Sequence, residues 1–252
     1  MYTKSILVLA LSAASMVSAH GNVQVVTGDK GGNVTALGIK GASVARFGAN
    51  AQTEQDTTVF AKGSANKPMT DGLGKTTDNG ALKVADLKAA MVSSGTTLPQ
   101  VSNDGTGTLT GTWRIVTSDG TANDKAGNLF AVLDTTGTGT YSQGKQLVAT
   151  SDMVGNGKGN VVQRAVESAL KSVGLLKRAN NVGADAPFSV KIPAGTTCTG
   201  NDAASGMTNF CLMKIANNNA AGPFGGNVAF QIAGAGAAAP AAAPAAKRAF
   251  KA

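Results

Sequence analysis

Histidine is nearly missing from this chain, because His20 is the only one in 252 residues. A hydrolase of the Ser-His-Asp type needs a histidine base, and no GxSxG nucleophile motif is present to pair with His20. Carboxylates that could serve a glycosidase are numerous, but nothing in their spacing selects a pair. The sequence therefore favours a protein without catalytic activity and leaves an enzymatic role as the alternative.

Aromatic residues are also scarce, at 4% of the chain. Trp113 is the single tryptophan, and Tyr141 is the only tyrosine beyond the first 19 residues. A flat sugar-binding platform usually presents exposed aromatic faces, so the composition gives little direct support for carbohydrate binding by ring stacking.

Positive charge is in excess, with a formal net charge of +8, but no arginine-rich patch is interleaved with aromatic residues. The lysines are scattered singly, which does not fit a nucleic-acid interface. A generally basic protein drawn to acidic wall polymers or membranes is the simpler interpretation.

Long apolar runs are absent, and the run from Ile6 to Ala14 is too short to span a bilayer. Lys4 precedes this run, and the small residues Val17-Ser18-Ala19 follow it, as in a secretory leader. Residues 1–19 are therefore predicted to be a signal peptide. The product is expected to be secreted and extracellular, without a transmembrane segment, and to begin at His20.

Only two cysteines occur, Cys198 and Cys211. They lack CxxC spacing and histidine neighbours, so a metal or redox pair is disfavoured. An oxidising destination favours a structural disulfide between them.

Short alternations of apolar and polar residues, separated by Gly, Asn, Asp and Ser, predict many short strands. In the clearest, Leu109, Trp113 and Ile115 share one face. The predicted strands are 22–26, 34–39, 57–61, 109–117, 129–133, 146–150, 188–192, 210–215 and 228–232. Apolar residues at helical spacing predict helices over 161–177 and 84–92. The fold class is therefore mainly β, a β-sandwich with one or two helices in its connections.

Residues 20–232 are expected to form a single domain. From residue 233 onward Ala, Gly and Pro dominate, which predicts a disordered tail that carries the dibasic pair Lys247-Arg248. Asn33 begins an Asn-Val-Thr sequon and is a candidate glycosylation site.

His20 has a chemistry of its own if it begins the mature chain. An amino-terminal histidine offers a metal its free amine and a ring nitrogen, which is the core of a copper histidine brace. A full brace needs a second imidazole, and this chain has none. Copper could still bind His20 together with a carboxylate such as Asp119, but more weakly. No cofactor is the first expectation, and copper is the alternative.

Several motifs occur in a defined order along the chain. They are His20-Gly21, Thr27–Gly32 (TGDKGG), Ala36–Gly38 (ALG), Thr97–Val101 (TLPQV), Asp134–Gly139 (DTTGTG), Pro193–Gly200 (PAGTTCTG), Cys211-Leu212 and Ala221–Gly226 (AGPFGG). In this order they resemble the fungal secreted virulence-factor family first noted as early-infection transcripts in powdery mildew and as appressorium-specific proteins in rice blast.

The resemblance implies a secreted fungal effector that acts at host penetration by the appressorium. The family's amino-terminal histidine is similar to that of lytic polysaccharide monooxygenases, which are copper-dependent and have immunoglobulin-like β-sandwich cores. Arg114 stands where many members place a further histidine, and a guanidinium cannot ligate a metal.

Three functional hypotheses follow. The first is a non-catalytic virulence factor whose partner is an unidentified component of the host or fungal cell wall or surface. The second is a copper-dependent enzyme that oxidises wall polysaccharide through His20. The third is a copper-binding protein without oxygen chemistry. None of them includes nucleic acid as a partner.

Overall fold

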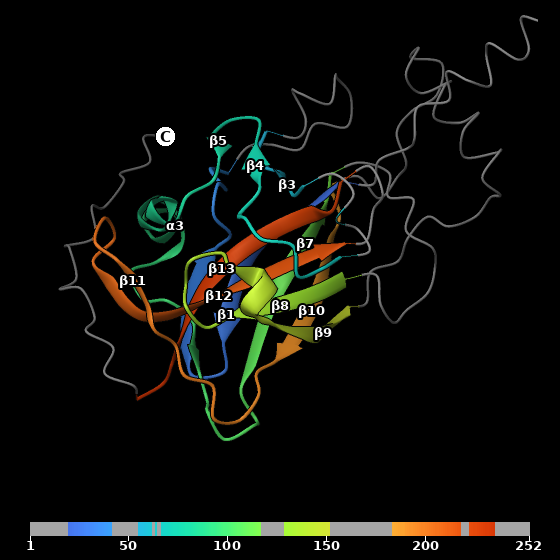
Figure 1. Cartoon of the computed structure of the whole chain (residues 1–252). Coiled ribbons are helices and arrows are strands. Elements are labelled where there is room, and N and C mark those ends of the chain that lie inside the picture. Colours follow the sequence, from blue (N-terminus) through green and yellow to red (C-terminus); the bar gives the residue numbers. More distant parts are fainter. Residues whose placement is uncertain are drawn as a thin grey trace, which may run out of the picture.

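Two antiparallel sheets that share one strand form the protein (Figure 1). The computed structural model describes residues 20–41, 55–61, 64, 67–116, 129–151, 183–217 and 222–234. The first sheet has the order β2-β1-β7-β10-β9, and the second continues from β9 through β8-β12-β13-β3-β4-β5. β6 and β11 pair with β13 and β12 at the side of this path. The prediction of a mainly β, sandwich-like fold is confirmed.

The strands lie close to the predicted positions where the sequence alternates clearly. Their bounds are β1 Gly21–Gly28, β2 Gly31–Thr35, β3 Thr58–Val59, β4 Lys75–Thr76, β5 Gly80–Ala81, β6 Gln100–Val101, β7 Thr108–Ile115, β8 Leu129–Asp134, β9 Lys145–Ser151, β10 Asp185–Lys191, β11 Gly200–Asp202, β12 Met207–Asn217 and β13 Phe224–Ile232. Only the β6–β13 pair is parallel among the described strands.

The helix predicted over 84–92 is confirmed as a short 3₁₀ turn, η1 Val84–Asp86, followed by α3 Leu87–Ser94. A second 3₁₀ turn, η2, covers Tyr141–Gln143. The helix predicted over 161–177, the signal peptide, and residues 235–252 of the predicted tail lie outside the described residues. No helix in the described part of the chain is long and apolar enough to cross a membrane.

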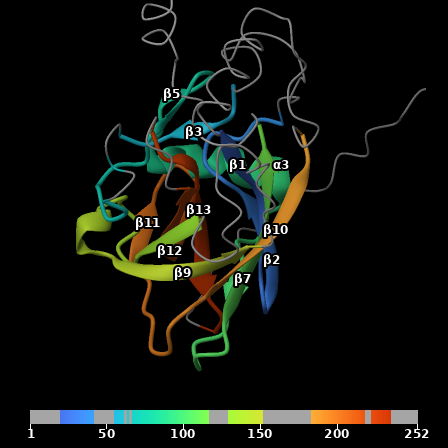
Figure 2. The ribbon, with the colours of Figure 1, turned by 90° about the vertical axis from the view of Figure 1, so that its right-hand side faces the viewer.

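The core lies between the two sheets, where β1 packs on β13. Trp113 of β7, Phe210 of β12 and Phe230 of β13 are among its largest buried side chains. The sheets come very close at Gly226, because a Cβ there would lie 2.6 Å from the Cβ of Ala36. β9 pairs with both β10 and β8, so the sandwich is curled and continuous along that side (Figure 2).

Candidate functional site

His20 lies at the start of β1, at one end of the sandwich. Its carbonyl oxygen accepts a hydrogen bond of 2.9 Å from the backbone N–H of Val116, which fixes the residue beside β7. The imidazole ring packs on the ring of Phe224, with 3.8 Å between the two centroids. The residue is 8% exposed. The aromatic neighbour of His20 is therefore a phenylalanine from the other sheet.

The following residue, Gly21, explains why the strand can start at this place. Gly21 is opposite Ile115 in the β1–β7 ladder, and the indole of Trp113 passes directly over it. A Cβ on Gly21 would lie 2.3 Å from atoms of that indole. Glycine is therefore required for Trp113 to fill the core while β1 stays paired.

Arg114 forms a salt bridge with Asp185, a residue that the sequence did not single out. Its Nε and one terminal nitrogen donate to the two carboxylate oxygens of Asp185 at 2.7 and 2.8 Å. The pair lies directly across the β7–β10 ladder. The hydrogen bonds to Asp185 raise the pKa of the Arg114 guanidinium, against the opposing effect of burial. The side chain at the position of the expected family histidine is therefore a charged donor with its own partner.

Of the two residues proposed for copper binding, the structure places only His20, because Asp119 lies outside the described residues. Tyr141 is fully buried, and its hydroxyl donates to the side-chain oxygen of Asn227 at 2.7 Å. Burial and the charge of Asp134 raise the pKa of Tyr141 well above its usual value. Among the residues that the structure describes, no group of three or more His, Cys, Asp or Glu side chains could hold a metal ion.

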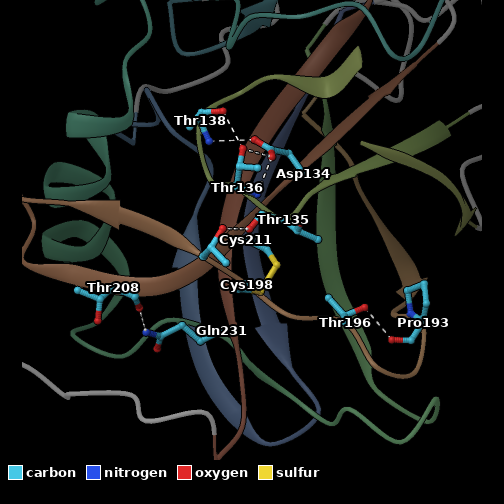
Figure 3. The surroundings of a disulfide bond; sticks show 11 residues. Asp134, Thr135, Thr136, Thr138, Pro193, Thr196, Cys198, Thr208, Cys211 and Gln231 are labelled. Atoms are coloured by element: carbon cyan, nitrogen blue, oxygen red, sulfur yellow. Dashed lines mark hydrogen bonds between the residues drawn. A yellow bond between two sulfur atoms is a disulfide. The ribbon is translucent and has the colours of Figure 1, made fainter. Parts of the chain in front are cut away.

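The predicted disulfide is confirmed, and it joins Cys198 to Cys211 of β12 (Figure 3). Both cysteines are buried and 13 residues apart in sequence. The adjacent residue Thr199 donates its backbone N–H to the carbonyl of Thr135 at 2.8 Å. The bridge therefore attaches the segment before β11 to β12, and the hydrogen bond of Thr199 joins the same segment to the turn that follows β8. This is a structural role.

That turn is organised by the buried carboxylate of Asp134. Its two oxygens accept hydrogen bonds from the backbone N–H groups of Thr136, Thr138 and Gly139 at 2.8, 2.9 and 2.7 Å. The hydroxyl of Thr136 adds a bond of 2.6 Å. One of the motifs that carry the family resemblance is thus an anchored turn.

Lys214 of β12 is a buried charge that sequence reasoning missed. Its ammonium group donates to the carbonyls of Pro68 and Thr70 at 3.2 and 2.5 Å. It also faces the rings of Tyr141 and Phe60, at 4.3 and 4.9 Å from their centroids. Lys214 is 2% exposed. A lysine within a predicted strand is normally expected to face the solvent. Nothing in the sequence around Lys214 indicates that the distant segment 67–73 packs over its side chain.

Burial lowers the pKa of Lys214 from 10.5 to about 8, although the charge of Asp71 acts in the opposite direction. Lys214 cannot reach a substrate while the covering segment is in place. We therefore assign it to stability rather than to chemistry.

Asn33, the candidate glycosylation site, lies in β2 and is exposed. Its backbone N–H donates to the carbonyl of Thr97 at 3.0 Å. Glycosylation of this residue stays a prediction.

Comparison with known proteins identifies the family. Residues 18–225 match the Egh16-like virulence factor family. The chain is 32% identical over 236 residues to the appressoria-specific virulence factor GAS1 of Pyricularia oryzae, covering 93% of this chain and 80% of that protein. It is 28% identical over 217 residues to the appressoria-specific virulence factor GAS2 of the same fungus, covering 86% of this chain and 66% of that one. No solved structure matches the chain significantly. The chain therefore belongs to the Egh16-like virulence factor family.

Proposed function

We propose that this protein is a secreted virulence factor that acts at host penetration by binding a component of the host or fungal surface, without catalysis. The main support for the proposed absence of catalysis is the bidentate salt bridge between Arg114 and Asp185. It occupies the position where the family resemblance leads us to expect a second imidazole. The names of the relatives GAS1 and GAS2 support the virulence role.

A copper brace with two imidazoles does not fit this chain. His20 is its only histidine, and Arg114 cannot replace the missing ligand because a guanidinium stays protonated. The ring of His20 is also packed on Phe224. These features favour a structural role for His20 within an end of the sandwich.

Weaker copper binding by the amine and ring of His20, together with a carboxylate such as Asp119, stays a separate prediction. It can be tested by titrating copper(II) into the mature protein that starts at His20. The control is the same protein with one extra leading glycine, which displaces the amine. Equal, weak binding by both proteins would remove the copper hypotheses, and tight binding only by the first would establish them.

The proposed function can be tested by genetic complementation in the fungus that encodes the protein. A deletion strain would receive the wild-type gene, a His20→Phe gene, or a gene without codons 2–19. His20→Phe removes the imidazole ligand but keeps an aromatic ring against Phe224. We expect the wild type and His20→Phe to restore host penetration equally, and the leaderless form to fail.

Protein levels and melting temperatures separate a binding role from a folding defect. Loss of penetration with His20→Phe at normal secretion and unchanged melting temperature would refute the non-catalytic proposal. Full complementation by the leaderless form would refute secretion as the route of action.

A further inference from the structure

The turn between β8 and η2 carries a continuous row of threonine hydroxyls. The Oγ atoms of Thr136 and Thr138 are 2.8 Å apart, and those of Thr138 and Thr140 are also 2.8 Å apart. Thr136 and Thr138 are exposed and Thr140 is half-buried. Figure 3 shows Thr136 and Thr138 beside the carboxylate of Asp134. We call Thr136, Thr138 and Thr140 the hydroxyl row.

The hydrogen bonds of the hydroxyl row can run in only one direction. A hydroxyl has a single proton, and that of Thr136 is donated to the carboxylate of Asp134 at 2.6 Å. The bond between Thr136 and Thr138 must therefore use the proton of Thr138, and the next bond must use the proton of Thr140. A hydroxyl that donates is also a better acceptor, because the bonds of a chain polarise one another. The row therefore offers a ligand lone pairs and no proton.

Backbone donors of the same turn are committed as well. The N–H groups of Thr136, Thr138 and Gly139 donate to Asp134. The N–H group of Ser142 donates to Asp71 at 2.6 Å, and its hydroxyl donates to the other oxygen of that carboxylate at 2.9 Å. A ligand that contacts these groups meets acceptors and must bring the donors itself.

Asp71 adds a negative charge at the end of the row where Thr140 lies. Its segment runs beside the turn, since Gly72 donates its backbone N–H to the carbonyl of Gly139 at 3.0 Å. The carboxylate is exposed. The backbone and side-chain hydrogen bonds from Ser142 lower the pKa of Asp71 below its ordinary value of 3.8. Asp71 is therefore ionised in mildly acidic as well as neutral solution.

The buried ammonium group of Lys214 leaves the charge of Asp71 available. It makes the smallest of the contributions to the lowered pKa of Asp71, and its own hydrogen bonds go to the carbonyls of Pro68 and Thr70. The formal net charge of the chain is +8, but in about 0.15 M salt charges more than about 8 Å apart are largely screened. A cationic ligand therefore responds mainly to the carboxylate beside it.

We propose that the hydroxyl row and Asp71 bind an amino sugar with a free ammonium group, as in a polymer of glucosamine. The inference rests on the proposed binding function and names its ligand class. An ammonium group brings three donors and no acceptor, which matches acceptors beside a carboxylate. The hydroxyls of the same sugar can donate to the threonine oxygens, whereas a lysine side chain has only an apolar stem behind its ammonium group. N-acetylation removes the charge and adds a carbonyl acceptor, so the acetylated polymer does not fit.

The test is calorimetric titration of the mature protein with a glucosamine hexamer, its N-acetylated form and a lysine hexapeptide. At about pH 5.5 Asp71 is ionised and the sugar amine is protonated. Asp71→Asn removes the charge but keeps an oxygen for Ser142, and Thr138→Val breaks the hydroxyl row at its centre. The matched control is Asp104→Asn, because Asp104 is also exposed and accepts bonds from the N–H and hydroxyl of Thr106. Melting temperatures verify that all variants fold.

We expect wild type and Asp104→Asn to bind the glucosamine hexamer equally. Asp71→Asn should bind it at least about tenfold more weakly, since charge-assisted hydrogen bonds are the stronger class. Thr138→Val should also bind more weakly, because it removes one acceptor and frees the proton of Thr140.

Unchanged binding by Asp71→Asn and Thr138→Val would overturn the assignment of this site. Equal binding of the acetylated hexamer would overturn the requirement for an ammonium group, and equal binding of the lysine peptide would overturn the choice of a sugar. Absence of binding by a wild-type protein that still restores penetration would overturn this inference and leave the proposed function standing.

Discussion

Replacing Lys214 by methionine is expected to change how the stability of the protein depends on pH. In the folded state the ammonium group is buried against two carbonyls and two aromatic rings, and its pKa falls from 10.5 to about 8. The difference of about 2.5 corresponds to roughly 3 kcal/mol, since one pKa unit is 1.36 kcal/mol. The folded state therefore binds this proton less tightly than the unfolded state.

The sign of the effect follows from that difference. Below pH 8 Lys214 is protonated in both states, so the full cost of burying the charge is present. Between about pH 8 and 10.5 the folded lysine loses its proton while the unfolded one keeps it, so the cost declines as pH rises. Relative to Lys214→Met, the wild type should gain up to about 3 kcal/mol over this range.

At pH 7 the two proteins should be nearly equally stable. The methionine variant avoids the free-energy cost of burying a charge. However, the carbonyls of Pro68 and Thr70 lose their hydrogen-bond donor, which costs about 1–3 kcal/mol. Urea unfolding at steps from pH 7 to pH 10.5 gives the free energy of unfolding of each protein. The exposed Lys191→Met variant is the control and should track the wild type. Parallel curves for wild type and Lys214→Met would refute the reasoning.

Three further perturbations test other parts of the structure. Replacing both Cys198 and Cys211 by alanine should cost about 3 kcal/mol of unfolding free energy, measured by urea titration, because the bridge closes a short loop. Gly21→Ala should lower the melting temperature by several degrees, since its Cβ would overlap Trp113; an unchanged value would contradict that packing. The pKa of Asp29 is lowered because its hydrogen bonds outweigh its burial, so Asp29→Asn should destabilise at neutral pH, and the difference should vanish as pH falls below 3.8.

Local pattern was sufficient to locate much of the secondary structure. The spacing of Leu109, Trp113 and Ile115 predicted both β7 and its buried face, and all three side chains are in the core. The helix over 84–92 was also found, since its apolar residues repeat at helical spacing. The short strands β4, β5, β6 and β11 were missed, because two or three residues show no alternation. The strand expected at 34–39 is instead β2, Gly31–Thr35, because it is paired directly to β1 across a short turn.

The sequence by itself determined the family, the mainly β fold and the disulfide, because each depends on residues close in the chain or, for the bridge, on there being only two cysteines. Only the tertiary structure decided which side chains meet. The pairing of Arg114 with Asp185, the contact of His20 with Phe224 and the covering of Lys214 all join segments far apart in sequence. These contacts depend on the register between strands, and a shift of one residue would turn each side chain to the opposite face.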